Sequence, residues 1–420
     1  MKAHCRCLNC IMPPHLLKKL LESKDRSIRE AALQTLLTTT RLRGERHVRS
    51  IAGVFPTAAN GARSIYDCHH KTRLPGATLA RAEGANPTSD VSVNQAYDGF
   101  GKTRDFYQKI FDRNSVDNRG MRLDGYVHRG IAFNNAFWDG QEMIFGDGDG
   151  ILFTDFTDSL DVIAHELTHG VTEFTANLEY HNQSGALNES VSDVFGSMVK
   201  QWTLGQTVDQ ADWLIGAEVF TPSVKGDALR SLKAPGTAYD NEQMGKDPQP
   251  DNFQNYLDLP DTEDGDFGGV HINSGIPNKA FYLAATGIGG YSWEEAGHIW
   301  YTSLLASNPQ TDFSDFASTT WIKAGQLYGS GSHQQQAIAA AWDGVGVKLS
   351  GASAASRLPD FGRVTLYGGT VSREKEGEQT LDLLRRQVAQ LSTEMKDIRD
   401  EVMKRRGNGS PTVAPIGANS

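Results

Sequence analysis

Two histidines four residues apart, His165 and His169, are the first feature of this chain that could do chemistry. They stand in the segment Asp161–Gly170 (DVIAHELTHG), with Glu166 directly after the first of them. On a helix, residues four apart lie one turn above each other on the same face, so their imidazoles could hold one metal ion. Catalytic zinc typically takes three protein ligands and keeps a fourth position for water, so one more ligand must come from elsewhere.

A second predicted helix offers that ligand. Glu189 lies in the run Gly185–Gly196, and Asp193 follows it one turn later on the same side. A chance HExxH sequence is usually a solvated helix face, and the matching acidic helix argues against that interpretation. Zinc brings the pKa of a coordinated water to about 7, so Glu166 is the predicted general base, passing the proton of that water to a leaving amine. A structural zinc would need no such carboxylate.

The chain closely resembles the thermolysin-like zinc metallopeptidases from about Ser64 to about Leu349. The resemblance rests on motifs in the family's order: NNAFW at 134–138, HELTH at 165–169, Tyr180, NESVSD at 188–193 and GGVHINSG at 268–275. It implies an α+β fold with a sheet-rich N-terminal lobe at 51–160, a helical C-terminal lobe at 161–350 and the active cleft between them. The implied activity is that of a zinc metalloendopeptidase acting on proteins and peptides.

Apolar periodicity agrees with this division into lobes. It predicts helices over 90–100 and 104–111 and short strands at 131–133 and 143–145 in the first lobe. Beyond residue 161 it predicts mainly helices, at 278–285, 292–305, 312–328 and 334–344. A cleft between two lobes is the usual place for a peptide-binding site.

The resemblance also implies groups that stabilise the transition state. An amide carbonyl becomes an oxyanion during attack, so donors must point at it from the side opposite Glu166. His271 would take this role, with Tyr180 assisting and Asp266 fixing the imidazole. Without the family, His271 in a glycine-rich turn could equally be a surface residue.

Two further residues would orient the metal ligands by the same resemblance. Ligand imidazoles normally donate their second nitrogen to a neighbouring oxygen. Asp193 would hold His165, and Asn188 would hold His169. Both supports lie on the predicted helix of Glu189, so one element would supply a ligand and two supports, a coincidence that simple surface polar residues do not explain.

For the substrate, the resemblance implies backbone clamps and an apolar pocket. The clamps would be Asn135 and the Ala136 carbonyl, with Trp138 nearby and Arg230 gripping a carbonyl beyond the cut; the pocket would comprise Phe153, Phe156, Val162 and Leu229. An apolar pocket rejects charge strongly but separates similar hydrophobes poorly. We therefore expect cleavage before bulky hydrophobic residues with loose selectivity, although aromatic side chains at these positions could equally belong to the core.

Calcium is where the chain departs from the family. Thermostable members hold paired calcium ions with acids near the second zinc helix. Here Asp161 and Asp212 remain, but Lys200, Leu214 and Ala217 stand where three of those acids would be. Two carboxylates and a lysine cannot form a cage of six to eight oxygens, so the paired site is predicted to be absent and Lys200 to act as an internal cation. A separate calcium loop involving Thr221 and Asp227 stays an open alternative.

Residues 1–50 form a segment apart from the two lobes. After Pro13-Pro14, apolar residues at helical spacing over 15–22 and 28–37 resemble the compact helical pro-region of the protealysin-type branch. The alternative is a regulatory or merely flexible arm. The small, turn-prone linker at 51–63 suits cleavage, so a zymogen that processes itself should be cut between residues 45 and 62.

Latency could come from either of two chemistries. The Pro13-Pro14 segment could lie along the substrate groove as a poor substrate, or a thiolate of Cys5, Cys7 or Cys10 could take the open zinc position. We favour the first, because it matches the family branch and because clustered thiols can merely bind stray metal.

The segment past the family-like region is predicted to be a helix for self-association. Residues 351–375 form a linker or short strand, 376–406 a coiled-coil helix and 407–420 a disordered tail. The 3-4 spacing that predicts a homo-oligomer is carried by Leu381, Leu384, Val388, Leu391, Met395, Ile398 and Val402. A helix docked on its own catalytic lobe would show the same stripe.

Composition and motifs argue against several other classes of function. A net charge of −10 argues against nucleic acid as the partner, and no apolar run is long enough to span a membrane. No Sec signal is evident, so we expect a cytoplasmic protein or one secreted by another route. A zinc-binding protein without catalysis would be expected to have lost Glu166, Tyr180 or His271, and all three are present. A coiled-coil assembly protein with a peptidase-derived head remains compatible with the enzyme.

Overall fold

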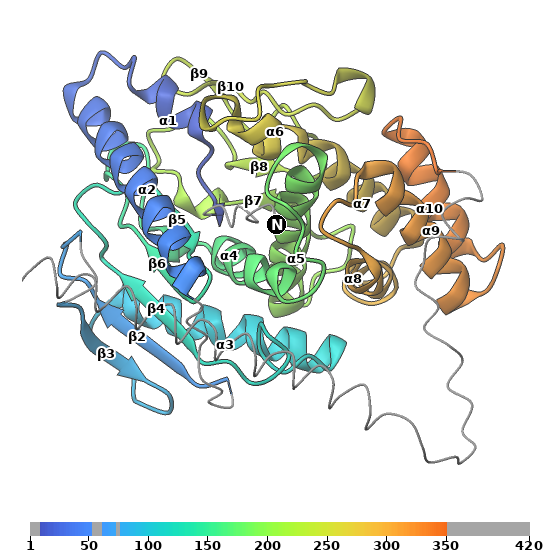
Figure 1. Cartoon of the computed structure of the whole chain (residues 1–420), viewed down its shortest axis with the longest axis horizontal. Coiled ribbons are helices and arrows are strands. Elements are labelled where there is room, and N and C mark those ends of the chain that lie inside the picture. Colours follow the sequence, from blue (N-terminus) through green and yellow to red (C-terminus); the bar gives the residue numbers. More distant parts are fainter. Residues whose placement is uncertain (1–8, 53–60, 73–75, 351–420) are drawn as a thin grey trace, which may run out of the picture. The chain divides into compact units, whose positions relative to one another are not determined.

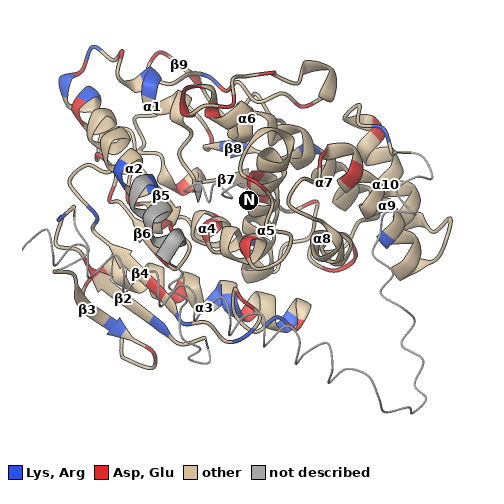
Figure 2. Ribbon diagram, viewed as in Figure 1, with Lys and Arg blue, Asp and Glu red and all other residues tan. Residues whose placement is uncertain are grey.

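The computed structural model describes residues 9–52, 61–72 and 76–350 (Figure 1). Cys5, Cys7 and most of the predicted linker fall outside these ranges. So do the predicted strand, coiled-coil helix and tail beyond residue 350. No described helix is both long and apolar enough to cross a membrane. Figure 2 shows acidic and basic residues interspersed along the described elements rather than gathered on one element.

A mixed six-stranded sheet forms the N-terminal lobe, in the order β1-β5-β6-β4-β2-β3. The strands are β1 (Asn9–Cys10), β2 (Arg63–Asp67), β3 (Thr78–Ala82), β4 (Leu123–Val127), β5 (Ala136–Trp138) and β6 (Glu142–Phe145). β2, β4 and β6 pair in parallel, and the other pairs are antiparallel. The edge strand β1 comes from the predicted pro-region, so the N-terminal segment extends the sheet beside β5.

The strand predicted at 143–145 is present within β6, whereas the strand predicted at 131–133 is wrong. Ala132 has φ of +51°, a left-handed conformation that breaks an extended strand, and residues 131–132 form a bend. The two predicted helices at 90–100 and 104–111 are one helix, α3 (Val91–Phe111), which packs against β2 and β4. The side chain of Asp90 caps it by accepting a hydrogen bond from the Val93 amide.

Helices dominate the C-terminal lobe, as predicted. They are α4 (Leu160–Glu173), α5 (Asn182–Leu204), α6 (Asp266–Asn273), α7 (Gly275–Ile288), α8 (Glu295–Ala306), α9 (Phe313–Tyr328) and α10 (His333–Gly344). Short strand pairs join them, β7 (Leu214–Ile215) with β8 (Arg230–Ser231) and β9 (Asp240–Asn241) with β10 (Gly245–Lys246). Single 3-10 turns lie at η1 (Phe156–Asp158), η2 (Ala217–Val219), η3 (Phe253–Asn255) and η4 (Glu263–Gly265).

The two central helices, α4 and α5, cross closely enough to bring their side chains together. Gly196 permits this approach, because a Cβ atom there would lie 2.6 Å from the carbonyl oxygen of Asp161. Most residues of both helices are buried. Polar residues at this crossing are therefore shielded from water on all sides.

From residue 9 onward, the N-terminal segment contains two helices, α1 (Pro14–Leu20) and α2 (Arg26–Ala52). Leu16, Leu17 and Leu20 of α1 are at most 1% exposed, so the segment packs as part of the molecule. Lys18 and Arg43 form ion pairs with Asp264 and Glu263, which lie in η4 of the C-terminal lobe. Figure 1 shows α2 in front of β5 and β6, and Leu42 of α2 shares an apolar cluster with Phe137 and Ile144 of these strands.

Candidate active site

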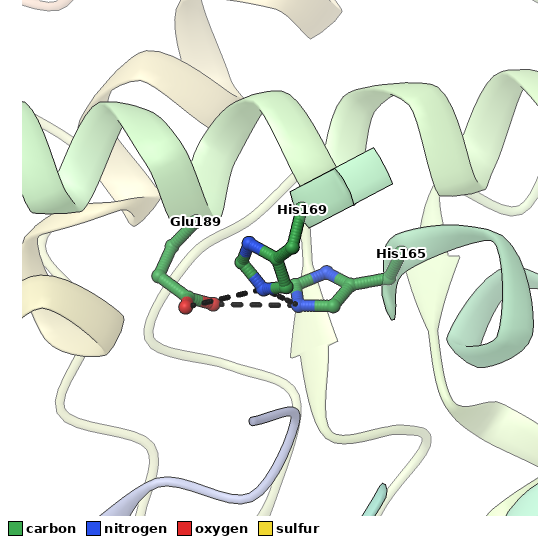
Figure 3. A group of neighbouring side chains, drawn as sticks. All are labelled: His165, His169 and Glu189. Atoms are coloured by element: carbon green, nitrogen blue, oxygen red, sulfur yellow. Dashed lines mark hydrogen bonds and ion pairs between the residues drawn. The ribbon is translucent and has the colours of Figure 1, made fainter. Parts of the chain in front are cut away.

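The crossing of α4 and α5 brings His165, His169 and Glu189 together with no exposed side-chain surface (Figure 3). The Nε2 atoms of the histidines lie 3.0 Å apart, and each is 3.4–3.5 Å from a carboxylate oxygen of Glu189. One zinc ion about 2 Å from each donor requires donor spacings of this size. Oε2 of Glu189 is buried without a hydrogen-bond partner, as expected of an oxygen reserved for a cation. The three residues therefore fit zinc.

The second nitrogens of both histidines are held on the side away from Glu189. Nδ1 of His165 lies 2.8 Å from Asp193, and Nδ1 of His169 lies 2.9 Å from the Asn188 side-chain oxygen. The hydroxyl of Ser192 also approaches Nδ1 of His169 at 3.0 Å, a contact that the sequence interpretation missed. When each Nδ1–H donates outward, each Nε2 lone pair is directed toward the metal position.

Glu166 follows the ligand His165 directly in α4, and its buried carboxyl group has one oxygen without a hydrogen-bond partner. Its Oε2 accepts a hydrogen bond from the Trp138 amide at 2.9 Å, while Oε1 has no hydrogen-bond partner. Burial raises the pKa of Glu166 well above its usual range, with a further contribution from the charge of Glu189. A carboxylate with a raised pKa is a better proton acceptor, which suits general-base chemistry near neutral pH.

His271 and Tyr180 also lie at the ligand cluster, each within reach of the Glu189 carboxylate. Nδ1 of His271 lies 2.6 Å from Asp266, and its Nε2 lies 3.3 Å from the Tyr180 hydroxyl. Tyr180 also donates to Glu189. Burial opposes protonation of His271, but the neighbouring Asp266 and Glu189 carboxylates outweigh it and hold the pKa of the imidazole well above its ordinary value. A charged imidazole is a strong donor toward a developing oxyanion.

The predicted glycine-rich turn around His271 is in fact the kinked helix α6. Phe267, Gly268 and Gly269 have φ between +51° and +82°, and regular helix resumes before His271. A Cβ at Gly268 would lie 2.2 Å from the side-chain oxygen of Asn182, so glycine is required there on two counts. The kink lets Asp266 reach both the backbone amide and the ring of His271.

Comparison with known proteins places this site in a family. The model of the thermolysin metallopeptidase catalytic domain matches residues 49–173, and that of its alpha-helical domain matches residues 176–347. The chain belongs to the thermolysin metallopeptidase family. It is therefore a zinc-dependent endopeptidase by family, and the predicted α+β fold, enzyme class and family are confirmed.

Individual relatives support the same assignment along most of the chain. An extracellular metalloprotease of Pectobacterium carotovorum is 48% identical over 342 residues, covering 81% of this chain and 96% of the relative. Protease PrtS of Photorhabdus is 43% identical, covering 81% and 92%. The solved precursor of protealysin, a metalloproteinase from Serratia proteamaculans, is 47% identical with a TM-score of 0.73, covering 81% of this chain and 99% of that one.

In this metallopeptidase, the N-terminal segment lies against the predicted substrate clamps. β1 pairs antiparallel with β5, and the Ile11 amide donates to the Ala136 carbonyl at 3.1 Å. The Met12 amide donates to the Asn135 side chain at 3.1 Å, and Arg230 donates to the Ile11 carbonyl at 2.9 Å. The structure thus brings these clamps together around residues 9–12, with Trp138 in the paired strand.

The predicted pocket residues Phe153, Phe156, Val162 and Leu229 are at most 3% exposed and share one apolar cluster with Ile11 and Met12. Residues 9–12, rather than Pro13-Pro14, contact the predicted clamps, since Pro13 caps α1 and Pro14 begins it. Sγ of Cys10 lies 3.6 Å from the Met12 carbonyl and is not among the clustered ligand atoms.

Lys200 lies at the far end of the α4–α5 crossing as an internal cation. Its Nζ is 3.2 Å from Asp161, 3.0 Å from Asp212 and 3.2 Å from Glu218. Glu218 was missed from the sequence, because it is brought to the lysine by a turn that the helix pattern does not encode. Three carboxylates hold the pKa of Lys200 above its ordinary value despite burial. The ammonium thus stands among oxygens that would otherwise suit a divalent ion.

The loop calcium site suggested at Thr221 and Asp227 stays an open alternative. The Thr221 hydroxyl donates to the Ile151 carbonyl, and Asp227 is exposed.

Among the described residues, one further group has metal-ligating geometry: His128, Asp147 and Asp155. Nδ1 of His128 lies 2.9 Å from the Asp147 carboxylate, and Nε2 lies 2.9 Å from the Asp90 carboxylate. These carboxylates raise the pKa of His128 to about 9, and the hydrogen bond to Asp147 makes the largest contribution. This histidine therefore acts as a charged bridge.

Proposed function

We propose that this metallopeptidase is made as a zymogen that processes itself and then cleaves protein and peptide substrates before bulky hydrophobic residues. One observation carries the proposal. The chain's own residues 9–12 make backbone hydrogen bonds with the residues proposed to clamp a substrate, beside the ligand cluster. A segment bound in this way excludes other chains, because the backbone donors and acceptors of a cleft can serve one strand at a time.

The residues around the cleft take different roles in the proposed reaction. When bound by His165, His169 and Glu189, zinc would polarise the attacking water and the substrate carbonyl. Glu166 would take the proton of that water and deliver it to the leaving nitrogen. His271 would donate to the carbonyl oxygen as it becomes negatively charged.

Specificity in this proposal follows from the burial of the pocket. Phe153, Phe156, Val162 and Leu229 present carbon surface, and burying one bulky hydrophobic side chain there is worth about 1.5–3 kcal/mol. A charged side chain would lose its hydration without gaining a partner. Arg230 would supply the donor that fixes the carbonyl of the residue after the cut, since it already serves Ile11 in this way.

Casein hydrolysis by the purified protein tests the activity. A chelator should abolish hydrolysis, and added zinc should restore it. Glu166→Gln should retain one zinc per chain yet lose nearly all hydrolysis, because three ligands remain while the base is gone. Full activity of Glu166→Gln would contradict the assigned mechanism.

Self-processing has a separate test. Wild-type protein should shorten itself within residues 45–62 during purification, and Glu166→Ala should stay full length. Intact mass and N-terminal sequencing would identify the new end. Equal processing of Glu166→Ala in a preparation free of other proteases would assign maturation to another enzyme. The name of the Pectobacterium relative, an extracellular metalloprotease, favours secretion over a cytoplasmic location, and culture fractionation distinguishes the two.

A further inference from the structure

Residues 9–12 present one particular peptide bond to the proposed reacting groups. The carbonyl oxygen of Cys10 lies 2.8 Å from Nε2 of His271, the proposed oxyanion donor. The amide of Ile11 donates to the Ala136 carbonyl of β5 at 3.1 Å, and the same strand donates to the Glu166 carboxylate through the Trp138 amide. The carbonyl of the Cys10–Ile11 bond therefore meets the proposed oxyanion donor, and its nitrogen is held by the strand that also binds the proposed base.

Hydrogen bonds on both sides hold the segment in this register. After the bond, the Ile11 carbonyl accepts from Arg230 and the Met12 amide donates to Asn135. Before it, β1 pairs antiparallel with β5. A shift of one residue would turn every side chain to the opposite face and break these bonds. The segment is thus held in one direction and one register.

We propose that Cys10–Ile11 is itself a substrate of the active site that it occupies, hydrolysed in cis as a cut distinct from the one in the linker. This inference rests on the proposed function. Water adds its hydroxyl to the carbonyl carbon of Cys10, and the carbon–nitrogen bond breaks. Glu166 transfers the proton of that water to the nitrogen of Ile11. The products are a carboxylate at Cys10 and an amine at Ile11.

Burial predicts which product leaves. Ile11, Met12, Leu16, Leu17 and Leu20 are at most 1% exposed, so the part of the segment after the cut stays anchored. Ion pairs from α1 and α2 to η4 hold it further. The part before the cut is held in the described structure mainly through the two-residue strand β1. Residues 1–10 should therefore dissociate while residues from Ile11 onward still block the primed side of the groove.

The test follows the N-terminus of zinc-stripped, full-length protein after zinc is added. Intact mass should fall by the mass of residues 1–10, and sequencing should give a new N-terminus at Ile11. The first-order rate should stay constant over a tenfold range of protein concentration, because the reaction is intramolecular. Glu166→Gln, treated identically, should keep its N-terminus.

A pair of variants at one position tests the register. Ile11→Asp should slow this cut at least tenfold, since it places a charge among buried apolar residues, whereas Ile11→Leu should stay within about threefold of wild type. Equal rates for both variants would overturn the assignment of this bond.

Labelling provides a measurement that does not depend on hydrolysis. Cys10 is 1% exposed in the structure, so in folded Glu166→Gln, which cannot cut itself, iodoacetamide should modify its thiol at least tenfold more slowly than in urea-unfolded protein. Equal labelling rates would show that the segment does not occupy the groove, which overturns the inference.

Casein assays on the same samples separate the two proposals. Hydrolysis of casein with Cys10–Ile11 still intact would overturn this inference and leave the proposed function standing. A rate that rises with protein concentration would also overturn it, because the cut would then be made by another molecule. Zinc-loaded protein that cleaves neither casein nor itself would refute the proposed function, and the inference with it.

Discussion

Replacing Lys200 by methionine should destabilise this metallopeptidase in a pH-dependent way. The substitution keeps a long apolar stem but removes the ammonium that lies 3.0–3.2 Å from Asp161, Asp212 and Glu218. Asp212 and Glu218 are 45% exposed, so water screens them, whereas Asp161 has no exposed side-chain surface. The penalty therefore falls mainly on Asp161, which lies in the first turn of the helix that carries both histidine ligands.

The size of the penalty is bounded by the cost of protonating that carboxylate. Burial already raises the Asp161 pKa in the native protein, and without Lys200 the group should become neutral. Holding a carboxyl with an ordinary pKa near 3.9 in its neutral form costs at most about 4 kcal/mol at pH 7 and about 1.5 kcal/mol at pH 5. Loss of one partner of a buried ion pair typically costs about 3–5 kcal/mol. We expect a loss of roughly 2–4 kcal/mol at pH 7 and half of that or less at pH 5.

The direction of the pH dependence follows from the linkage between folding and the protonation of Asp161. In Lys200→Met the folded form keeps a proton on Asp161 that the unfolded form releases, so the folded form loses stability as pH rises. Urea unfolding at pH 5 and pH 7, in a Glu166→Gln background that prevents autolysis, would measure both values. Lys225→Met, at an exposed lysine, is the matched control and should change stability by less than about 0.5 kcal/mol. A loss below that size at pH 7, or an equal loss at both pH values, would refute the reasoning.

Charge reversal extends the same experiment to calcium. Lys200→Glu would gather four carboxylates at one point, an oxygen-rich set that suits calcium. Millimolar calcium should therefore restore part of the stability of Lys200→Glu and leave Lys200→Met unchanged. Equal responses of the two variants would show that the cluster cannot be converted into a calcium site.

Three shorter predictions concern other parts of the chain. His271→Ala should keep its fold and zinc while kcat/KM falls by roughly 10²–10³, and an unchanged rate would remove His271 from catalysis. His128→Gln should lower the free energy of unfolding by roughly 1–2 kcal/mol at pH 6, a value discounted for solvent screening, and the difference from wild type should vanish toward pH 10. A loss of stability that does not change with pH would contradict the role of His128 as a charged bridge between two carboxylates. The full chain should be oligomeric, and glutamate at Leu384, Leu391 and Ile398 should yield monomers with normal catalysis; light scattering showing a monomer before mutation would mean that the stripe packs elsewhere.

The ligand cluster was predictable because its geometry is local. A spacing of four residues fixes where His165 and His169 lie on a helix, and the same rule relates Glu189 to Asp193. Ser192 escaped notice because a serine within a helix carries no pattern of its own. Its contact with His169 exists only because two helices cross at a glycine.

Positions with unusual backbone conformations were not predictable from apolar periodicity. Ile131 to Phe133 has the composition of a strand, yet Ala132 takes a left-handed conformation. His271 was expected in a turn, because glycines at 268 and 269 suggest one, whereas a helix resumes directly after them. In both cases the backbone takes left-handed conformations, which the spacing of apolar residues does not encode.

Contacts between residues far apart in the sequence were also not predictable. The sequence predicted an N-terminal segment in the groove but placed Pro13-Pro14 there, because nothing local distinguishes those residues from the ones just before them. The register depends on residues far away in sequence, among them Arg230, which lies more than 200 residues from Ile11. That guanidinium donates through Nε and Nη2 to Asp193, which in turn orients His165, and through Nη1 to the carbonyl of Ile11. One side chain thus connects the occupant of the groove to a metal ligand, so the backbone position of a bound peptide and the orientation of the zinc site are fixed by the same group.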